Sequence, residues 1–138
     1  MQKYTHRFTV PASAIDALGH ANNIEYVRWV QDTAVAHSDH VGLPWGAYRA
    51  MGAAFVVRRH SIEYLRSVRE GEALEATTWI EKCARITADR VTQIADASGQ
   101  LVATSRTLWA FVSLTTWRPV RIPVEVRLAF GQPPRVVG

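Results

Sequence analysis

The stretch Asn-Asn-Ile-Glu-Tyr-Val-Arg-Trp-Val-Gln-Asp-Thr-Ala-Val, residues 22–35, decides the fold of this chain. This stretch predicts a helix with an apolar stripe along one side. Ile24 and Val27 widen that stripe around the helix. A helix that rests on a surface needs only one narrow stripe, so we expect this one to be surrounded by other elements. The stripe itself consists of apolar side chains that recur at helical spacing: Tyr26, Trp29, Val30, Ala34 and Val35.

Residues on both sides of this stretch indicate where the helix begins and ends. Asn22 can cap its start, and Glu25 three residues later completes a pattern typical of a capping box. Gly42 and Pro44 end the helix, because glycine suits the position after a helix and proline cannot continue one. A further short turn of helix is expected over residues 45–51.

The rest of the chain is strand-like. A first strand is expected over residues 4–10. After Gly52 the sequence is rich in Val, Ile, Thr and aromatic residues, which favour strands. One helix cannot cover both faces of a sheet, so the pattern predicts an α+β domain in which a curved antiparallel sheet of about five strands wraps around the long central helix. The later strands are expected over residues 54–68, 73–83, 86–97 and 101–114.

The length of 138 residues suits one compact domain. We expect this domain over residues 1–128 and an irregular C-terminal tail over residues 129–138. The apolar share of 48% and the charged share of 20% are those of an ordinary globular protein. A sheet face or edge that the helix does not cover is free to associate, so we expect a homodimer or a homotetramer.

Charge, cysteine content and apolar runs argue against several classes of function. The 16 basic and 12 acidic residues give a net charge of +4, and no Lys/Arg block is interleaved with aromatics, so nucleic-acid binding is not expected. The single cysteine, Cys83, excludes an internal disulfide and a cysteine-based zinc site, and we expect no metal and no cofactor. Short apolar runs and an N-terminus without an apolar core predict a cytoplasmic protein without a membrane span.

The chemistry-bearing side chains gather in the turn before the helix. Asp16, His20 and Asn23 supply a carboxylate, an imidazole and an amide there. A helix N-terminus offers unpaired N–H groups and the positive end of a dipole, which suit a developing oxyanion. A carboxylate held nearby could attack an activated carbonyl or deprotonate a water.

Each of these residues also has a structural interpretation. Asp16 could simply close an Asx turn, and His20 could orient the loop, hydrogen-bond Asp16 or move a proton. Asn22 is expected to act as a cap rather than as a ligand. The backbone N–H of Asn23 is a candidate oxyanion donor, and Tyr26 is expected to pack or to face a substrate.

The chain as a whole resembles the 4-hydroxybenzoyl-CoA thioesterase-like family of the hotdog superfamily. Besides residues 16–29, three segments carry the resemblance: the turn after the helix, the second strand and the closing segment, at residues 41–45, 61–66 and 116–123. The resemblance covers nearly the whole chain. It implies a hotdog fold, a homo-oligomer whose site lies across a subunit interface, and coenzyme A bound along a basic groove.

The resemblance implies an acyl-CoA thioesterase, which hydrolyses an acyl thioester to a free acid and coenzyme A. Asp16 stands where the family keeps its nucleophile or general base, and Asn23 falls where related subgroups have His or Tyr. Asp16 with His20 and the two asparagines also resembles acyl-acyl-carrier-protein thioesterases, although Leu18 replaces the catalytic Asn of that pattern. Such a thioesterase, or a non-catalytic acyl-CoA-binding hotdog protein, therefore remains an alternative.

The expected substrate-binding residues are of two kinds. Gly19 is expected to bind the substrate, and Tyr26 is expected to pack or to face the acyl pocket. Arginine side chains suit bidentate contacts with the phosphates of coenzyme A, although solvated surface charge is their ordinary role. The candidates are Gly19, Tyr26, Arg58, Arg59, Arg85 and Arg90.

Overall fold

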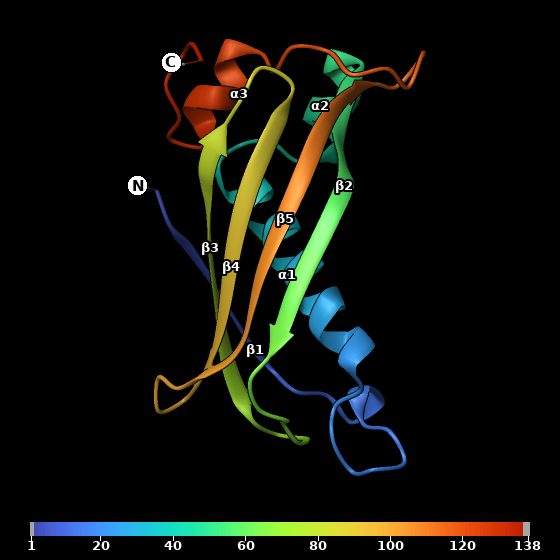
Figure 1. Ribbon diagram of the computed structural model, residues 1–138, viewed down its shortest axis with the longest axis vertical. Coiled ribbons are helices and arrows are strands. Elements are labelled where there is room, and N and C mark those ends of the chain that lie inside the picture. The colour runs from blue at the N-terminus through green and yellow to red at the C-terminus, as the bar shows by residue number, and fades with distance from the viewer. Residues whose placement is uncertain (1, 137–138) are drawn as a thin grey trace.

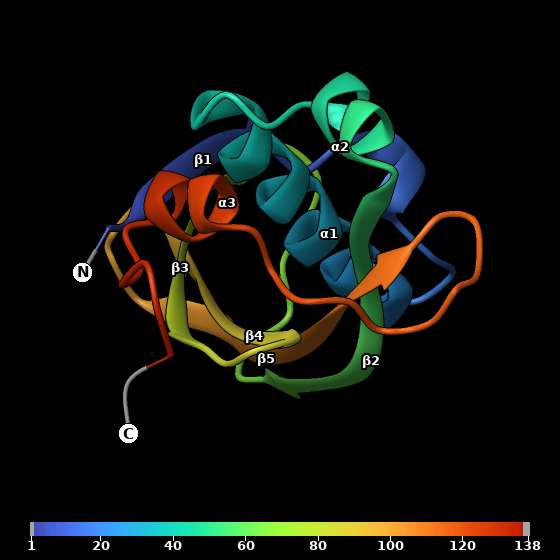
Figure 2. The same cartoon turned by 90° about the horizontal axis from the view of Figure 1, so that it is seen from above.

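A long helix, α1 (Asn23–His40), lies against one face of an antiparallel sheet that curves around it (Figures 1 and 2). The computed structural model describes residues 2–136. The predicted α+β class, with about five strands around a central helix, is confirmed. In spatial order the strands are β1 (Tyr4–Thr9), β3 (Ala73–Cys83), β4 (Thr87–Asp96), β5 (Leu101–Ser113) and β2 (Ala53–Tyr64).

Short helices close one end of the sheet. The helix α2 (Trp45–Met51) was expected and lies beside the start of β2, whereas α3 (Val124–Ala129) was not expected (Figure 1). Phe130 is buried, and the side chain of Gln132 donates to the carbonyl oxygen of Ile80 at 2.8 Å. The first residues of the expected irregular tail therefore pack against the rest of the chain, while residues 137–138 lie outside the described residues.

The start of α1 confirms the expected cap but not the capping box. The side-chain oxygen of Asn22 accepts a hydrogen bond from the N–H of Ile24 at 3.0 Å. In a capping box the carboxylate of Glu25 would turn back toward the N–H of Asn22. It instead accepts a hydrogen bond from Nε of Arg28 at 2.8 Å. The prediction was wrong because a salt bridge three residues along the helix competes for the same carboxylate.

Only one face of α1 is covered by the sheet. Its other face leaves Ile24 65% exposed and Val35 52% exposed, so the expectation that the helix is surrounded is wrong for this chain by itself. Ile24, Val27 and Val35 are exposed on this open face beside charged residues, and such exposed apolar side chains often mark an interaction surface. The covered face carries the buried side chains Tyr26, Trp29, Val30, Thr33, Ala34 and His37.

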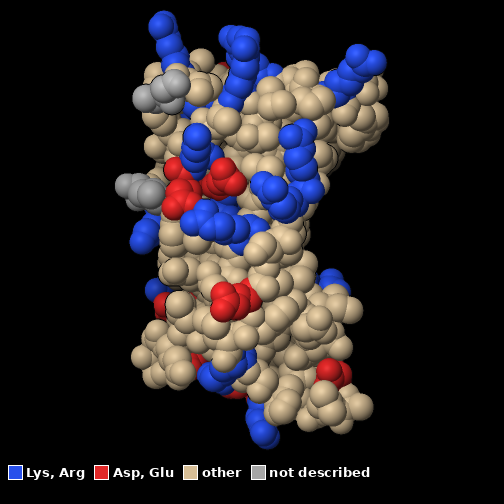
Figure 3. Space-filling model, in the orientation of Figure 1, with Lys and Arg blue, Asp and Glu red and all other residues tan. Residues whose placement is uncertain are grey.

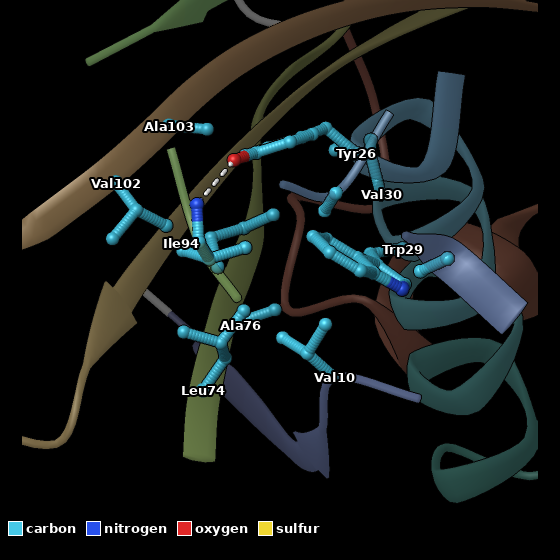
Figure 4. Close-up of a cluster of buried hydrophobic side chains, with 12 residues drawn as sticks. Val10, Tyr26, Trp29, Val30, Leu74, Ala76, Ile94, Val102 and Ala103 are labelled. Carbon is cyan, nitrogen blue, oxygen red and sulfur yellow. Dashed lines mark hydrogen bonds between the residues drawn. The ribbon is translucent and has the colours of Figure 1, made fainter. Parts of the chain in front are cut away.

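Two apolar clusters fill the space between α1 and the sheet. One gathers around Tyr26 and Trp29 and is shown in Figure 4. The other contains Phe111 and Phe130, at the end where α2 and α3 lie, together with the buried thiol of Cys83. Between the two, β3, β4 and β5 place a belt of buried polar side chains on the same face, namely Thr78, Arg90, Thr92, Ser105 and Thr107.

No helix within residues 2–136 is both long enough and apolar enough to cross a membrane.

The hydroxyl of Tyr26 ties α1 to the segment that joins β2 and β3 (Figure 4). It donates to the carbonyl oxygen of Arg66 at 3.2 Å and accepts from the N–H of Val68 at 3.1 Å. Val68 is fully buried, so no water can replace this acceptor.

We expect Tyr26→Phe to lower the free energy of unfolding by about 1–3 kcal/mol, because it leaves the buried N–H of Val68 without an acceptor. Urea denaturation measures this loss. Tyr64→Phe is the matched control, since the exposed hydroxyl of Tyr64 donates only to the carbonyl oxygen of Asn23, at 3.3 Å. Equal, small effects of the two substitutions would contradict this role of Tyr26.

Candidate active site

A tight loop holds Asp16 just before α1. The N–H of Asp16 donates to the carbonyl oxygen of His20 at 3.0 Å, and the N–H of Gly19 donates back to the carbonyl oxygen of Asp16 at 3.0 Å. Ile15 and Ala21 form an antiparallel bridge at the base of the loop. Gly19 has a φ of +80°, a conformation that glycine adopts without strain, so its role here is to close the turn.

The carboxylate of Asp16 is partly exposed and only partly engaged. Its Oδ1 accepts from the N–H of Leu18 at 2.9 Å, which confirms the Asx turn. Its Oδ2 has one longer contact, from the side-chain amide of Asn22 at 3.4 Å. The turn therefore fixes the direction of the carboxylate and leaves one oxygen available for a reacting group.

The first residues of α1 offer the donors that an oxyanion needs. Asn22 caps the N–H of Ile24, and the N–H of Glu25 donates to the carbonyl oxygen of Asn22 at 2.9 Å. Within residues 2–136 the N–H of Asn23 has no hydrogen-bond acceptor. Asn23 is an exposed residue at the positive end of the helix dipole, so its N–H stays a candidate oxyanion donor.

The ring of His20 does not meet the carboxylate of Asp16. The loop joins the two residues through the backbone, and no described residue forms a hydrogen bond with the imidazole. The ring is half-buried beside the loop. The imidazole of His20 therefore forms no hydrogen bond with the carboxylate of Asp16 in this conformation, and the other expected roles of His20 stay open.

Tyr26 does not reach a substrate cavity. Both hydrogen bonds of its hydroxyl go to the backbone at Arg66 and Val68, and burial raises the pKa of the phenol. It is a core residue, which was the first of its two expected roles.

Three of the four candidate arginines are on the surface. Arg58 and Arg59 lie at a bulge in β2, and Arg85 lies in the turn between β3 and β4. In the part of the chain that the structure describes, none of the three forms a salt bridge. Figure 3 shows Lys and Arg side chains gathered over the half of this face that lies toward α2 and α3. Such a gathering of positive charge favours anionic ligands in general.

Arg90 is not a surface residue, and its expected contact with phosphate at the surface was wrong. It is 4% exposed, beneath α1, and its Nη1 donates to Nδ1 of His37 at 2.9 Å and to the hydroxyl of Thr78 at 3.0 Å. Alternate residues of β4 point at the helix, and Arg90 shares the parity of Ala88 and Ile94. This alternation is visible in the sequence and indicates a buried position for Arg90. The charge of arginine favoured a surface position instead.

The structure also contains a cavity that the sequence did not indicate. It has a volume of about 240 Å³ and lies between the C-terminal half of α1, α2 and the sheet. Ala34, which lines the cavity, lies eleven residues after Asn23, the first residue of α1. Eleven residues span roughly 16 Å along a helix. The Asp16 loop and the cavity are therefore at opposite ends of α1. Its wall includes Ala34, Leu43, Tyr48, Phe55, Trp109 and Phe130.

Solved structures of similar fold are known. One assigned as an oleoyl thioesterase from Lactobacillus plantarum has a TM-score of 0.91 and 24% identity, over 99% of this chain and 52% of that one. A 1,4-dihydroxy-2-naphthoyl-CoA thioesterase from Synechocystis has a TM-score of 0.87 and 17% identity, over 94% and 96% of the two chains. A Staphylococcus aureus protein in complex with CoA has a TM-score of 0.86 and 17% identity, over 99% and 89%.

At these identities the solved structures establish the fold, and this chain spans about half the length of the Lactobacillus protein. No curated protein sequence matches significantly. A family model described as the thioesterase-like superfamily matches residues 10–130, which is most of the chain. The expected hotdog fold is thus confirmed, and the chain belongs to the thioesterase-like superfamily.

Proposed function

We propose that this protein hydrolyses the thioester of an acyl-CoA, with Asp16 as nucleophile or general base. One observation carries the proposal: a turn holds the carboxylate of Asp16 with one oxygen available, just ahead of the N–H of Asn23 that no described residue uses. A thioester carbonyl needs both a group that attacks its carbon and donors for its oxygen. In a thioesterase-family fold, this loop supplies the two together.

The reaction follows from these two groups. Either Oδ2 of Asp16 attacks the carbonyl carbon, or it takes a proton from a water that attacks. The carbonyl oxygen becomes an oxyanion, which the N–H groups at the start of α1 stabilise. The C–S bond then breaks and the thiolate of coenzyme A leaves, with His20 or solvent supplying its proton. In the direct route, water hydrolyses the resulting mixed anhydride and regenerates Asp16.

The site becomes complete when two copies associate through β2. Among the described strands β2 pairs only with β5, so its outer edge is free, and Val56 and Val57 on it are exposed. Exposed apolar edges of this kind favour pairing with another chain. Two β2 edges related by a twofold axis pair antiparallel, which places the end of one strand beside the start of the other.

This pairing joins the two halves of the site. Tyr64, at the end of β2, contacts Asn23 and so marks the end of the molecule where Asp16 lies. Ala54 and Phe55, at the start of β2, line the cavity. Antiparallel pairing therefore brings Asp16 of one protomer to the cavity of the other, and the apolar side chains on the open face of α1 become covered. We assign the cavity to the acyl group on this basis.

Exposed arginines support coenzyme A as the carrier. Arg58 and Arg59 lie on β2 itself, next to the edge that forms the proposed dimer, and Arg85 lies at the end of the sheet near α2 and α3. The fold neighbour from Staphylococcus aureus holds CoA. An acidic acyl carrier protein is the alternative partner for the same charges, and parallel assays with acyl-CoA and acyl-acyl-carrier-protein separate the two.

We expect Asp16→Asn to lower kcat by about 10²- to 10⁴-fold, because the amide can neither attack a carbonyl nor take a proton. The Asx turn survives, since the amide oxygen still accepts from Leu18. Release of free thiol from a panel of acyl-CoA substrates measures the loss. Asp32→Asn, which removes an exposed carboxylate elsewhere on α1, is the control and should leave the rate unchanged. Near-normal hydrolysis by Asp16→Asn would refute the mechanism.

A mixed-subunit experiment tests the shared site. Ala34→Phe should fill the cavity, which has room for the added ring, and abolish turnover while the protein stays folded. Mixing this variant with Asp16→Asn, then unfolding and refolding the two together, creates hybrid dimers with one intact site. About a quarter of wild-type activity should return, since half of the dimers are hybrids. If the mixture stays inactive although hybrids form, each site belongs to one protomer.

A further inference from the structure

The unsatisfied polar atoms of the core gather in one place. Within residues 2–136, four buried side-chain atoms have no hydrogen-bond partner: Nε2 of His60, Nε of Arg90, Oγ of Ser105 and Nε1 of Trp109. All four lie on β2, β4 and β5, and Thr107 joins two of them, because it pairs with Arg90 on one side and with His60 on the other. Such atoms are rare in folded proteins, and two of the four belong to residues that line the cavity beneath α1, Arg90 and Trp109.

Arg90 is the only one of the four that carries a charge. Its Nη1 donates to His37 and Thr78, but its Nε and Nη2 have no acceptor among the described residues. Burial, with a smaller effect of Arg90, lowers the pKa of His37 to about 4, so this partner is neutral at pH 7. Burial lowers the pKa of Arg90 only to about 10, so the guanidinium stays charged.

No carboxylate neutralises this charge. Residues 2–136 contain no salt bridge to Arg90, and its guanidinium lies over the ring of Phe130, with Cζ 5.6 Å from the ring centroid. Asp39 lines the cavity, but it is exposed at the rim and forms no ion pair with Arg90. A buried cation without a counter-ion is strongly unfavourable, and arginine is rarely buried without a partner.

The charge is presented to the cavity beneath α1. Arg90 and Trp109 both contribute to its wall, which is otherwise mainly apolar. The volume of about 240 Å³ is below the range of roughly 300–1,000 Å³ for pockets that take drug-sized ligands, which favours a short group. A saturated hydrocarbon chain would fill the apolar part but leave Arg90 uncompensated.

We propose that this cavity selects a short acyl group that ends in a carboxylate, and that the guanidinium of Arg90 binds this carboxylate. The apolar wall takes the methylene groups between the thioester and the charge. The identification of the ligand as an acyl group rests on the proposed function, whereas carboxylate binding by the cavity does not. Arg90 is thus a specificity-determining residue, not a catalytic one.

The test compares two non-hydrolysable ligands of equal length by calorimetry, the thioether analogues of glutaryl-CoA and of pentanoyl-CoA. They differ in one terminal group, a carboxylate against a methyl. The wild-type protein should bind the glutaryl analogue at least about tenfold more tightly. Equal affinities, or a preference for the pentanoyl analogue, would overturn the proposal whether or not any variant folds.

Substitutions then locate the preference. Arg90→Met should remove it or reverse it, and the buried methionine should be tolerated, because apolar residues of similar volume often replace buried charges without loss of stability. Arg90→Lys should retain part of the preference. Arg59→Met, on the surface, is the control: it should weaken both analogues equally. A preference that survives Arg90→Met would assign the carboxylate to another site.

A parallel hydrolysis assay with glutaryl-CoA and pentanoyl-CoA separates the two proposals. Preferential binding of the carboxylate analogue without hydrolysis of either thioester would remove the proposed function and leave the binding site. Hydrolysis of both at equal kcat/KM, with equal binding of the analogues, would leave the function and remove the site.

Discussion

The packing of one face of α1 into the concave side of the sheet is the constraint on which the rest of the structure depends. That face buries Tyr26 and Trp29 toward one end and His37 toward the other. Because a helix is rigid over this length, fixing it fixes both of its ends. Its N-terminus carries the Asp16 loop, and its C-terminal half forms a wall of the cavity. The two halves of the proposed site are held by one element but kept apart.

Because the Asp16 loop and the cavity lie apart in one chain, we propose that the uncovered surfaces bring them together in a dimer. Apolar side chains on the open face of α1 and on the edge of β2 are uncovered in one chain. The proposed antiparallel pairing would cover them and bring an Asp16 loop to each cavity. Association therefore does not merely stabilise the protein; in this account it assembles the reacting carboxylate, the oxyanion donors and the acyl pocket.

Most of the helices and strands could be predicted from the sequence, because the spacing of apolar residues within each element indicates its type. β3 and α2 have the predicted bounds, and β4 and β5 differ from theirs by a residue or two. The site was less predictable. The position of Asp16 before a helix was visible as a local pattern, but the side chain of Arg90 was assigned to the surface by its charge, against the alternation of β4. The cavity joins residues from α1, α2 and four strands or their neighbours, so no local pattern could indicate it.

The central claim is that the Asp16 loop of one protomer faces an acyl group held by the other. The crystal structure of the Asp16→Asn variant with a bound acyl-CoA tests it most directly. The thioester carbon should lie within about 3–3.5 Å of the side chain at position 16, with the carbonyl oxygen toward the N–H of Asn23 and the acyl group in the cavity of the neighbouring protomer. A thioester bound away from this loop, with the side chain at position 16 facing solvent, would contradict it.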